Sequence, residues 1–290
     1  MRYLTIAVLL AVFAVPGLGR AGDKEVLRIG IPRSMFQEIP PGLALFAGLP
    51  FKELIKSQTG LNGDVLNEAD SFVVSRDLDS GKLKLGVFLG HEFAWAKQQY
   101  PGLEPLVCAV PRTKEVQALL LVRHDCKASN LAEMRGAKLV IATAMRDHPR
   151  MFLEGRRAME IKVGGFGSTE KVDTQHDAIH KVMENEADIT AVDSAAWAYF
   201  EKLYPGPCQN LRVLARSDVF PPNVIAYKKG SLDDATIKAI RDGLSTTHEN
   251  PKAKRMMSVI RLDRFDSPPK NYDEMLKASL KAYPKPLTDK

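Results

Sequence analysis

Two stretches in the first half of the sequence place polar side chains directly after predicted strands. Arg33 follows the strand expected at 26–31, and its guanidinium could hold an oxyanion through two parallel hydrogen bonds. His91 and Glu92 follow the strand expected at 83–89, where the next helix begins. Ligands of parallel α/β sheets bind beyond the carboxyl ends of strands. These three residues are therefore candidates for a ligand site, although an arginine in a loop can also be simply solvated.

The second half repeats the pattern. Arg146 and His148 follow the strand expected at 137–143, and Pro149 suits the first turn of the helix after it. Backbone N–H groups at a helix start attract anions, and Arg146 would add a fixed positive charge. An ordinary capped helix is the alternative interpretation of this segment.

His176 and Asp193 complete the set. His176 opens a predicted helix and can donate a hydrogen bond to an oxyanion. Asp193 ends a predicted strand, where it could face a ligand or serve only as a helix N-cap. The predicted ligand-binding residues are Arg33, His91, Glu92, Arg146, His148, His176 and Asp193.

Catalytic motifs are missing from the sequence. It contains no G-x-S-x-G, P-loop or H-E-x-x-H pattern, so we expect a binding protein and neither an enzyme nor a protein with a cofactor or resident metal. Two alternatives stay open. One is an enzyme with Cys108 or Cys126 as nucleophile beside a histidine. The other is a metal-capturing protein that uses His91, Glu92, His148 and His176.

The composition is that of a globular chain with a substantial core. The 290 residues are 45% hydrophobic and carry a net charge of +6, with basic residues scattered along the chain. Nucleic acid is not an expected partner, because its binding requires a concentrated basic stripe. The 3 cysteines are too few for a disulfide framework, and the sequence does not decide how they pair.

The first residues are typical of a secretory leader. Arg2 precedes an apolar run at 4–15, and a small-x-small tripeptide follows at 19–21. The run is shorter than the roughly 20 residues needed to span a bilayer. We expect a signal peptide at 1–21 and a mature protein in the periplasm, with an uncleaved signal anchor as the alternative.

Strands and helices alternate along most of the chain, which predicts an α/β fold. Two successive β/α sets, joined by extended segments near 110 and 215, indicate two lobes. We expect residues 22–112 plus 215–290 in lobe 1 and 113–214 in lobe 2, each lobe a mostly parallel sheet flanked by helices. A cleft between such lobes is a natural ligand site, and the lobes can close on the ligand.

Three segments carry a family resemblance. The stretches at 83–90, 175–194 and 220–227 resemble the phosphate/phosphite/phosphonate-binding family of periplasmic solute-binding proteins, which supply ABC transporters. The resemblance implies a type 2 periplasmic binding fold, a small anionic ligand and a permease partner in the inner membrane. It also implies ligand contacts at His176 and Asp193.

The sequence departs from that family at two places. Relatives carry Ser-Thr-Ser-Gly where this chain has Arg-Asp-His-Pro at 146–149, and Gly-Pro-x-x-Tyr where it has Gly-His-Glu-Phe-Ala at 90–94. These changes imply a different ligand or a different way of binding an oxyanion. We expect a monomeric binding protein for a phosphonate-like or other anionic solute. A protein that feeds an external sensor kinase would share this fold.

Overall fold

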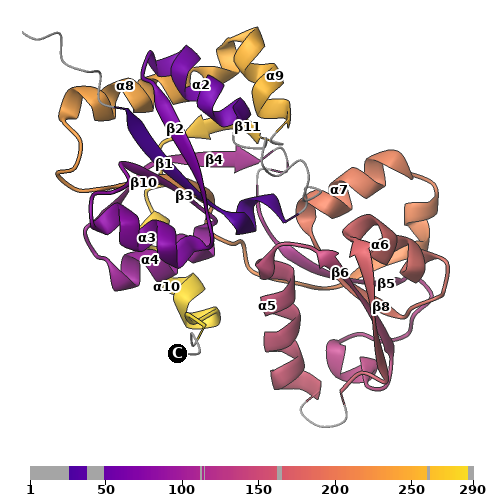
Figure 1. Ribbon diagram of the computed structural model, residues 1–290. Coiled ribbons are helices and arrows are strands. Elements are labelled where there is room, and N and C mark those ends of the chain that lie inside the picture. Colours follow the sequence, from indigo (N-terminus) through magenta and orange to yellow (C-terminus); the bar gives the residue numbers. More distant parts are fainter. Residues whose placement is uncertain are drawn as a thin grey trace, which may run out of the picture.

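Two lobes make up the computed structural model, which describes residues 26–37, 49–111, 113, 115–161, 165–259 and 262–286 (Figure 1). The predicted signal peptide at 1–21 and the first part of the helix expected at 43–58 lie outside these residues. No helix among the described residues is long and apolar enough to cross a membrane.

Lobe 1 is built on a six-stranded sheet. Its strands are β1 (Leu27–Pro32), β2 (Gly63–Glu68), β3 (Leu85–Phe88), β4 (Leu103–Pro111), β10 (Asn223–Lys228) and β11 (Leu262–Asp266). They lie in the order β11-β4-β10-β3-β1-β2. β1 is parallel to both β2 and β3, so the carboxyl ends of these three strands meet at one edge.

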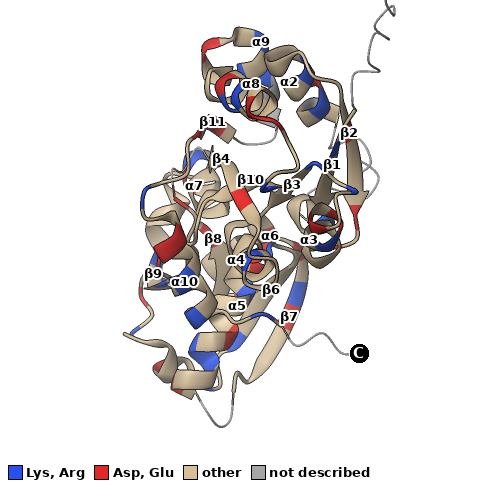
Figure 2. Ribbon diagram, turned by 90° about the vertical axis from the view of Figure 1, so that its left-hand side faces the viewer, with Lys and Arg blue, Asp and Glu red and all other residues tan. Residues whose placement is uncertain are grey.

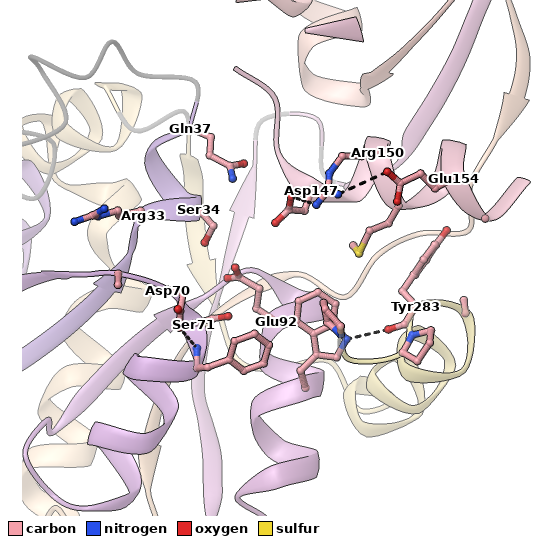
Figure 3. Close-up of a pocket in the computed structure, with 18 residues that line it drawn as sticks. Arg33, Ser34, Gln37, Asp70, Ser71, Glu92, Asp147, Arg150, Glu154 and Tyr283 are labelled. Carbon is pink, nitrogen blue, oxygen red and sulfur yellow. Dashed lines mark hydrogen bonds and ion pairs between the residues drawn. The ribbon is translucent and has the colours of Figure 1, made fainter. Parts of the chain in front are cut away.

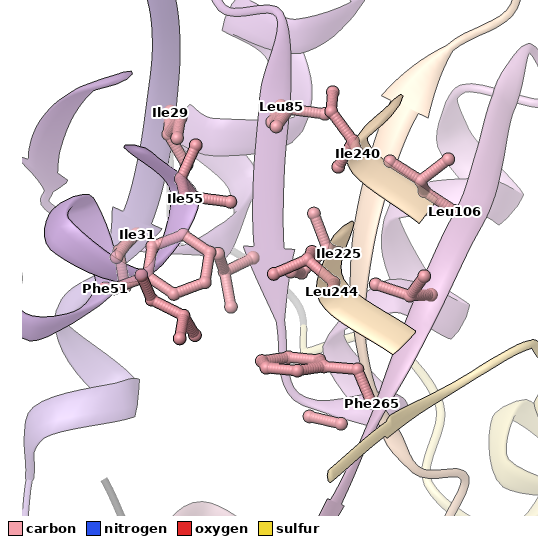
Figure 4. Close-up of a cluster of buried hydrophobic side chains, with 14 of the residues drawn as sticks. Ile29, Ile31, Phe51, Ile55, Leu85, Leu106, Ile225, Ile240, Leu244 and Phe265 are labelled. Carbon is pink, nitrogen blue, oxygen red and sulfur yellow. The ribbon is translucent and has the colours of Figure 1, made fainter. Parts of the chain in front are cut away.

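Helices cover both faces of this sheet. The helices of lobe 1 are α2 (Leu49–Thr59), α3 (Ser71–Asp79), α4 (Gly90–Gln99), α8 (Asp234–Ser245), α9 (Pro251–Val259) and α10 (Tyr272–Ala282). Ile55 of α2 and Leu244 of α8 pack with Ile29 and Phe265 of the sheet on one face (Figure 4). Side chains of α3, α4 and α10 form the core on the other face. Because both faces are covered, the central strands β3 and β10 are mostly apolar.

Lobe 2 has the same three layers around five strands. These are β5 (Ala118–Arg123), β6 (Lys138–Ala144), β7 (Ser168–Thr174), β8 (Ile189–Asp193) and β9 (Leu211–Arg216), in the order β7-β6-β8-β5-β9. α5 (Asp147–Arg156) packs on one face, and α6 (Gln175–Met183) and α7 (Ser194–Leu203) pack on the other. Figure 2 shows acidic and basic residues interspersed over both lobes.

Short helical turns complete the elements. They are η1 (Arg33–Phe36), η2 (Leu131–Met134), the π-helical turn η3 (Arg157–Ile161), η4 (Pro207–Asn210) and η5 (Thr247–Glu249). Asp70 caps α3 by accepting hydrogen bonds from the N–H groups of Phe72 and Val73 at 2.8 and 2.9 Å.

The two-lobed α/β architecture expected from the sequence is confirmed, but both sheets are mixed rather than mostly parallel. β10 is antiparallel to β3 and β4, and β5 is antiparallel to β8 and β9. The reason is the connectivity. The chain crosses from lobe to lobe between β4 and β5 and again between β9 and β10, so these strands enter their sheets without the helical crossover that makes neighbours parallel.

The two crossings lie against each other. Val116 in the first and Phe220 in the second form an antiparallel bridge, with the Phe220 N–H donating to the Val116 carbonyl at 2.9 Å. The second crossing also rests on lobe 1, because the Tyr272 hydroxyl donates to the Pro222 carbonyl at 2.9 Å. The lobes are therefore joined by a paired connection that is anchored on α10.

Gly90 is the first residue of α4 and lies directly against the second crossing. A Cβ on Gly90 would lie 1.8 Å from the Pro221 carbonyl oxygen, which is backbone and cannot rotate away. We expect Gly90→Ala to lower the free energy of unfolding by about 3 kcal/mol, as overpacked sites do. Chemical denaturation measures this loss.

The matched control is Gly102→Ala, because a Cβ there would meet nothing within 4 Å. Its unfolding free energy should stay within about 0.5 kcal/mol of the parent. Equal stability of the two variants would show that α4 does not pack against the crossing.

Candidate ligand-binding site

A cavity of about 570 Å³ lies between the lobes, a size suited to a small molecule (Figure 3). Lobe 1 contributes the turn after β1 and the starts of α3 and α4, and lobe 2 contributes one side of α5. The last described residues of the chain form a third wall. The lining residues used below are Arg33, Ser34, Gln37, Asp70, Ser71, Glu92, Trp95, Asp147, Arg150, Glu154 and Tyr283.

The strand order explains why the lobe 1 residues meet. β1, β2 and β3 are parallel neighbours, and η1, α3 and α4 follow their carboxyl ends. Ser34, Ser71 and Glu92 therefore come to one edge of the sheet from three separate parts of the chain. This edge is where ligands of α/β sheets bind.

Each helix start at the cavity carries its own carboxylate. Asp70 caps α3, Glu92 lies in the first turn of α4, and Asp147 lies in the first turn of α5. Carboxylates at these positions stabilise the positive end of the helix dipole. An incoming anion therefore meets helix starts whose positive ends are already partly neutralised.

The lobe 2 wall is a small ion-pair network. Arg150 Nη2 lies 2.7 Å from Asp147 Oδ1, and Arg150 Nη1 lies 3.6 Å from Glu154 Oε1. The two carboxylates hold the guanidinium along the exposed side of α5, at the cavity wall (Figure 3). The looser contact to Glu154 is the one that a ligand oxyanion can replace most easily.

Glu92 is the buried acid of the cavity, with only 4% of its surface exposed. Its Oε2 accepts a hydrogen bond from the Leu89 N–H at 3.1 Å. Burial, with a smaller contribution from the Asp147 carboxylate, raises the pKa of this carboxyl to about 7, against the lowering effect of its hydrogen-bond donors. The hydroxyls of Ser34 and Ser71 lie against this carboxyl and act on it as hydrogen-bond donors. Oε1 of Gln37, in the same wall, is buried without a hydrogen-bond partner among the described residues.

The C-terminal segment after α10 closes the third side. The Trp95 indole N–H donates to the Tyr283 carbonyl at 2.9 Å, which ties this segment to α4. The Tyr283 ring stacks on Phe220 at 4.9 Å, so the same residue also contacts the second crossing. Sequence patterns gave no signal for this wall.

His91 and His148 meet across the two lobes. Their ring centroids are 6.5 Å apart, and Phe220 lies against both at 5.9 and 5.2 Å. Both imidazoles are 2% exposed, and neither Nε2 has a hydrogen-bond partner among the described residues. Burial lowers the pKa of His91 to about 4 despite the opposing charge of Asp147. Burial also lowers the pKa of His148, against the influence of Asp193.

The seven predicted site residues do not lie in one place. Arg33 and Glu92 line the cavity, although Figure 3 shows the Arg33 guanidinium turned away from Ser34 and Glu92. His91 and His148 lie together where the lobes meet. Arg146 is the N-cap residue of α5, and its charge and that of Asp193 act on His148.

Asp193 and His176 have other surroundings. The Asp193 carboxylate is 2% exposed, accepts a hydrogen bond from the Gln175 amide at 2.9 Å and caps α7 through the Ala196 N–H at 2.6 Å. The His176 ring packs against Phe200 and Tyr204 at 5.2 and 5.4 Å, between α6 and α7. The structure thus places His176 on the face of the lobe 2 sheet opposite α5, and it does not line the cavity.

Several lining residues were not predicted from the sequence. No motif marked Arg150. The junction from β2 to α3 is a further strand-to-helix start, and this signal could have marked Asp70 and Ser71.

The two alternatives to ligand binding gain no geometric support. Among the described residues, no three His, Cys, Asp or Glu side chains are grouped so that they could hold a metal ion. All three cysteines are free thiols, and burial raises the pKa of Cys108 to about 12, which keeps it protonated and unreactive.

Two α/β lobes that share a cavity are the architecture of a solute-binding protein. The family model for periplasmic substrate-binding proteins of phosphonate ABC transporters matches residues 48–272. The chain belongs to this family. Its members bind small-molecule ligands and work with membrane permeases. No curated protein matches the chain significantly in sequence.

Solved structures share the fold. The protein XAC2383 from Xanthomonas citri, bound to ATP, superposes with a TM-score of 0.63 at 17% identity, over 89% of this chain and 96% of that one. PhnD1 from Prochlorococcus marinus, in complex with methylphosphonate, gives 0.60 at 14% identity, over 90% and 100%. A binding component of a phosphonate transporter from Pseudomonas aeruginosa gives 0.60 at 14% identity, over 90% and 88%.

The histidine pair predicts acid sensitivity. The folded protein favours neutral His91, whereas the unfolded chain takes up the proton below about pH 6.5, so stability is lost as pH falls from 6.5 toward 4. Between pH 7 and pH 5 this amounts to about 2 kcal/mol for His91. We expect His91→Phe to remove most of that loss in urea denaturation at the two pH values.

The control is His124→Gln, which changes an exposed histidine. It should lose as much stability between pH 7 and pH 5 as the parent does. If His91→Phe behaves like this control, the imidazole is not held neutral at the lobe junction.

Proposed function

We propose that the protein captures a small oxyanion in the interlobe cavity and delivers it to an ABC permease in the inner membrane. The observation that carries this proposal is that both lobes line one cavity with polar groups from helix starts. A ligand that contacts both walls at once stabilises the closed arrangement of the lobes. The proposed lobes are residues 22–112 with 215–290, and residues 113–214.

The oxyanion would be held by neutral donors more than by unpaired charge. The hydroxyls of Ser34 and Ser71 and the amide of Gln37 line lobe 1, and Arg150 lines lobe 2. Arg150 would exchange its long contact with Glu154 for a bond to the ligand. Methylphosphonate is the first candidate, since a structural neighbour was solved with it.

The proposed setting is the periplasm, reached through the signal peptide at 1–21, with the mature protein working as a monomer. The family described by the matching model is periplasmic. No observation on the site favours a sensor kinase over a permease as the recipient of the closed form.

A thermal-shift and calorimetric screen tests the ligand. The panel contains methylphosphonate, phosphate, phosphite, methanesulfonate and small organic acids. A true ligand at 100 times its Kd should add about 2.7 kcal/mol to the free energy of unfolding. Small-angle scattering should show the molecule contracting when that ligand is added.

Arg150→Ala and Arg157→Ala form the matched pair of variants. Arg150 lines the cavity, whereas Arg157 is exposed on η3 outside it. We expect Arg150→Ala to weaken binding at least about tenfold, since it removes a charge-assisted hydrogen bond, and Arg157→Ala to leave it unchanged. Equal affinities of the two variants, or no response to any compound, would contradict the proposal.

A further inference from the structure

The Glu92 carboxyl has an unusual place in the cavity. It lies in the first turn of α4, is 4% exposed, and forms part of the cavity wall. Figure 3 shows the carboxyl facing the same space as Ser34 and Asp147. The Leu89 N–H donates to one of its oxygens at 3.1 Å, and the hydroxyls of Ser34 and Ser71 also act on the carboxyl as hydrogen-bond donors. A ligand in the cavity therefore meets a buried carboxyl directly.

The charges around this carboxyl do not compensate it. Among the described residues, no ion pair includes Glu92, and the cation of the opposite wall, Arg150, is held by Asp147 and Glu154. The charged and titratable groups that line the cavity with Glu92 are Arg33 from η1, Asp70 from the start of α3, Asp147, Arg150 and Glu154 from α5, and Tyr283 from the C-terminal segment. Its neighbour in the chain, His91, is buried and neutral.

An oxyanion beside an ionised Glu92 would place two negative charges together in a poorly solvated space. Such a pair is strongly disfavoured, because like charges of this kind share a proton instead. With one proton between them, the contact becomes a short, charge-assisted hydrogen bond.

We propose that Glu92 sets the protonation state of the bound complex by sharing one proton with a ligand oxygen. This inference rests on the proposed capture of an oxyanion and adds the rule by which the cavity selects it. A protonated Glu92 donates to a fully ionised ligand, or an ionised Glu92 accepts from the O–H of a partly protonated one. Both descriptions contain the same single proton, which moves between two oxygens, and no bond between heavy atoms forms or breaks.

Because Glu92 is buried, it gains or loses its proton near neutral pH. Burial raises the pKa of the carboxyl to about 7, so the free protein holds the proton below neutrality and has lost it above. Binding above pH 8 must therefore take one proton from the buffer. A sulfonate, which carries no proton of its own at these pH values, depends on Glu92 alone.

Titration calorimetry measures the proton directly. Methylphosphonate and methanesulfonate are titrated at pH 8.5 in buffers of different ionisation enthalpy, and the slope of the heat gives the protons taken up per ligand. We expect the parent protein to take up about one proton per ligand bound. At pH values above the pKa of Glu92, its affinity for methanesulfonate should fall about tenfold per pH unit.

Glu92→Gln is the decisive variant. Its side-chain oxygen can still accept from the Leu89 N–H, and its amide can still donate to the ligand, but it cannot ionise. We expect proton uptake near zero and methanesulfonate affinity that is independent of pH. Glu184→Gln removes an exposed acid that does not line the cavity and should behave like the parent.

The role of Glu92 and the proposed capture of an oxyanion would be overturned by different results. Ligand binding by the parent protein without proton uptake, or uptake that persists in Glu92→Gln, overturns the role of Glu92 and leaves the proposed function intact. Failure of every oxyanion to bind the parent protein at any pH overturns the proposed function and this inference together. If Glu92→Gln does not fold, the proton uptake of the parent protein alone decides.

Discussion

The contacts of Phe220 determine how the two lobes are arranged. Its backbone pairs with Val116 in the other crossing, and its ring, 3% exposed, touches His91 of lobe 1, His148 of lobe 2 and Tyr283 of the C-terminal segment. Phe220 thus joins the two connections through its backbone, and its ring joins both lobes and the third wall of the cavity.

The electrostatics of the cavity follow from its position at helix starts. In many α/β proteins such starts are open to an anion. Here Asp70, Glu92 and Asp147 already occupy them, and Arg150 is engaged by two carboxylates. The proposed binding mode therefore uses neutral donors such as Ser34 and a proton on Glu92. It would connect the departures from the family pattern at 90–94 and 146–149 to a different way of holding an oxyanion.

Burial also favours the neutral form of the two histidines at the junction. His91 and His148 fill the space beside Phe220 as neutral, ring-shaped side chains, and their unpartnered Nε2 atoms would be costly to leave there in charged form. The junction is therefore compact at neutral pH. Its neighbour Glu92 titrates close to neutrality for the same physical reason, which is burial at the junction.

The sequence by itself determined the two-lobed α/β fold, because apolar runs and capped helix starts are local patterns. It also marked Arg33 and Glu92, since both follow strands directly. It missed β7 and β11, two edge strands that are too polar to show an apolar pattern. Only the tertiary structure decided that β10 runs antiparallel, that Tyr283 closes the cavity and that His176 packs between α6 and α7. These facts depend on contacts between residues far apart in the chain, and local periodicity carries no information about them.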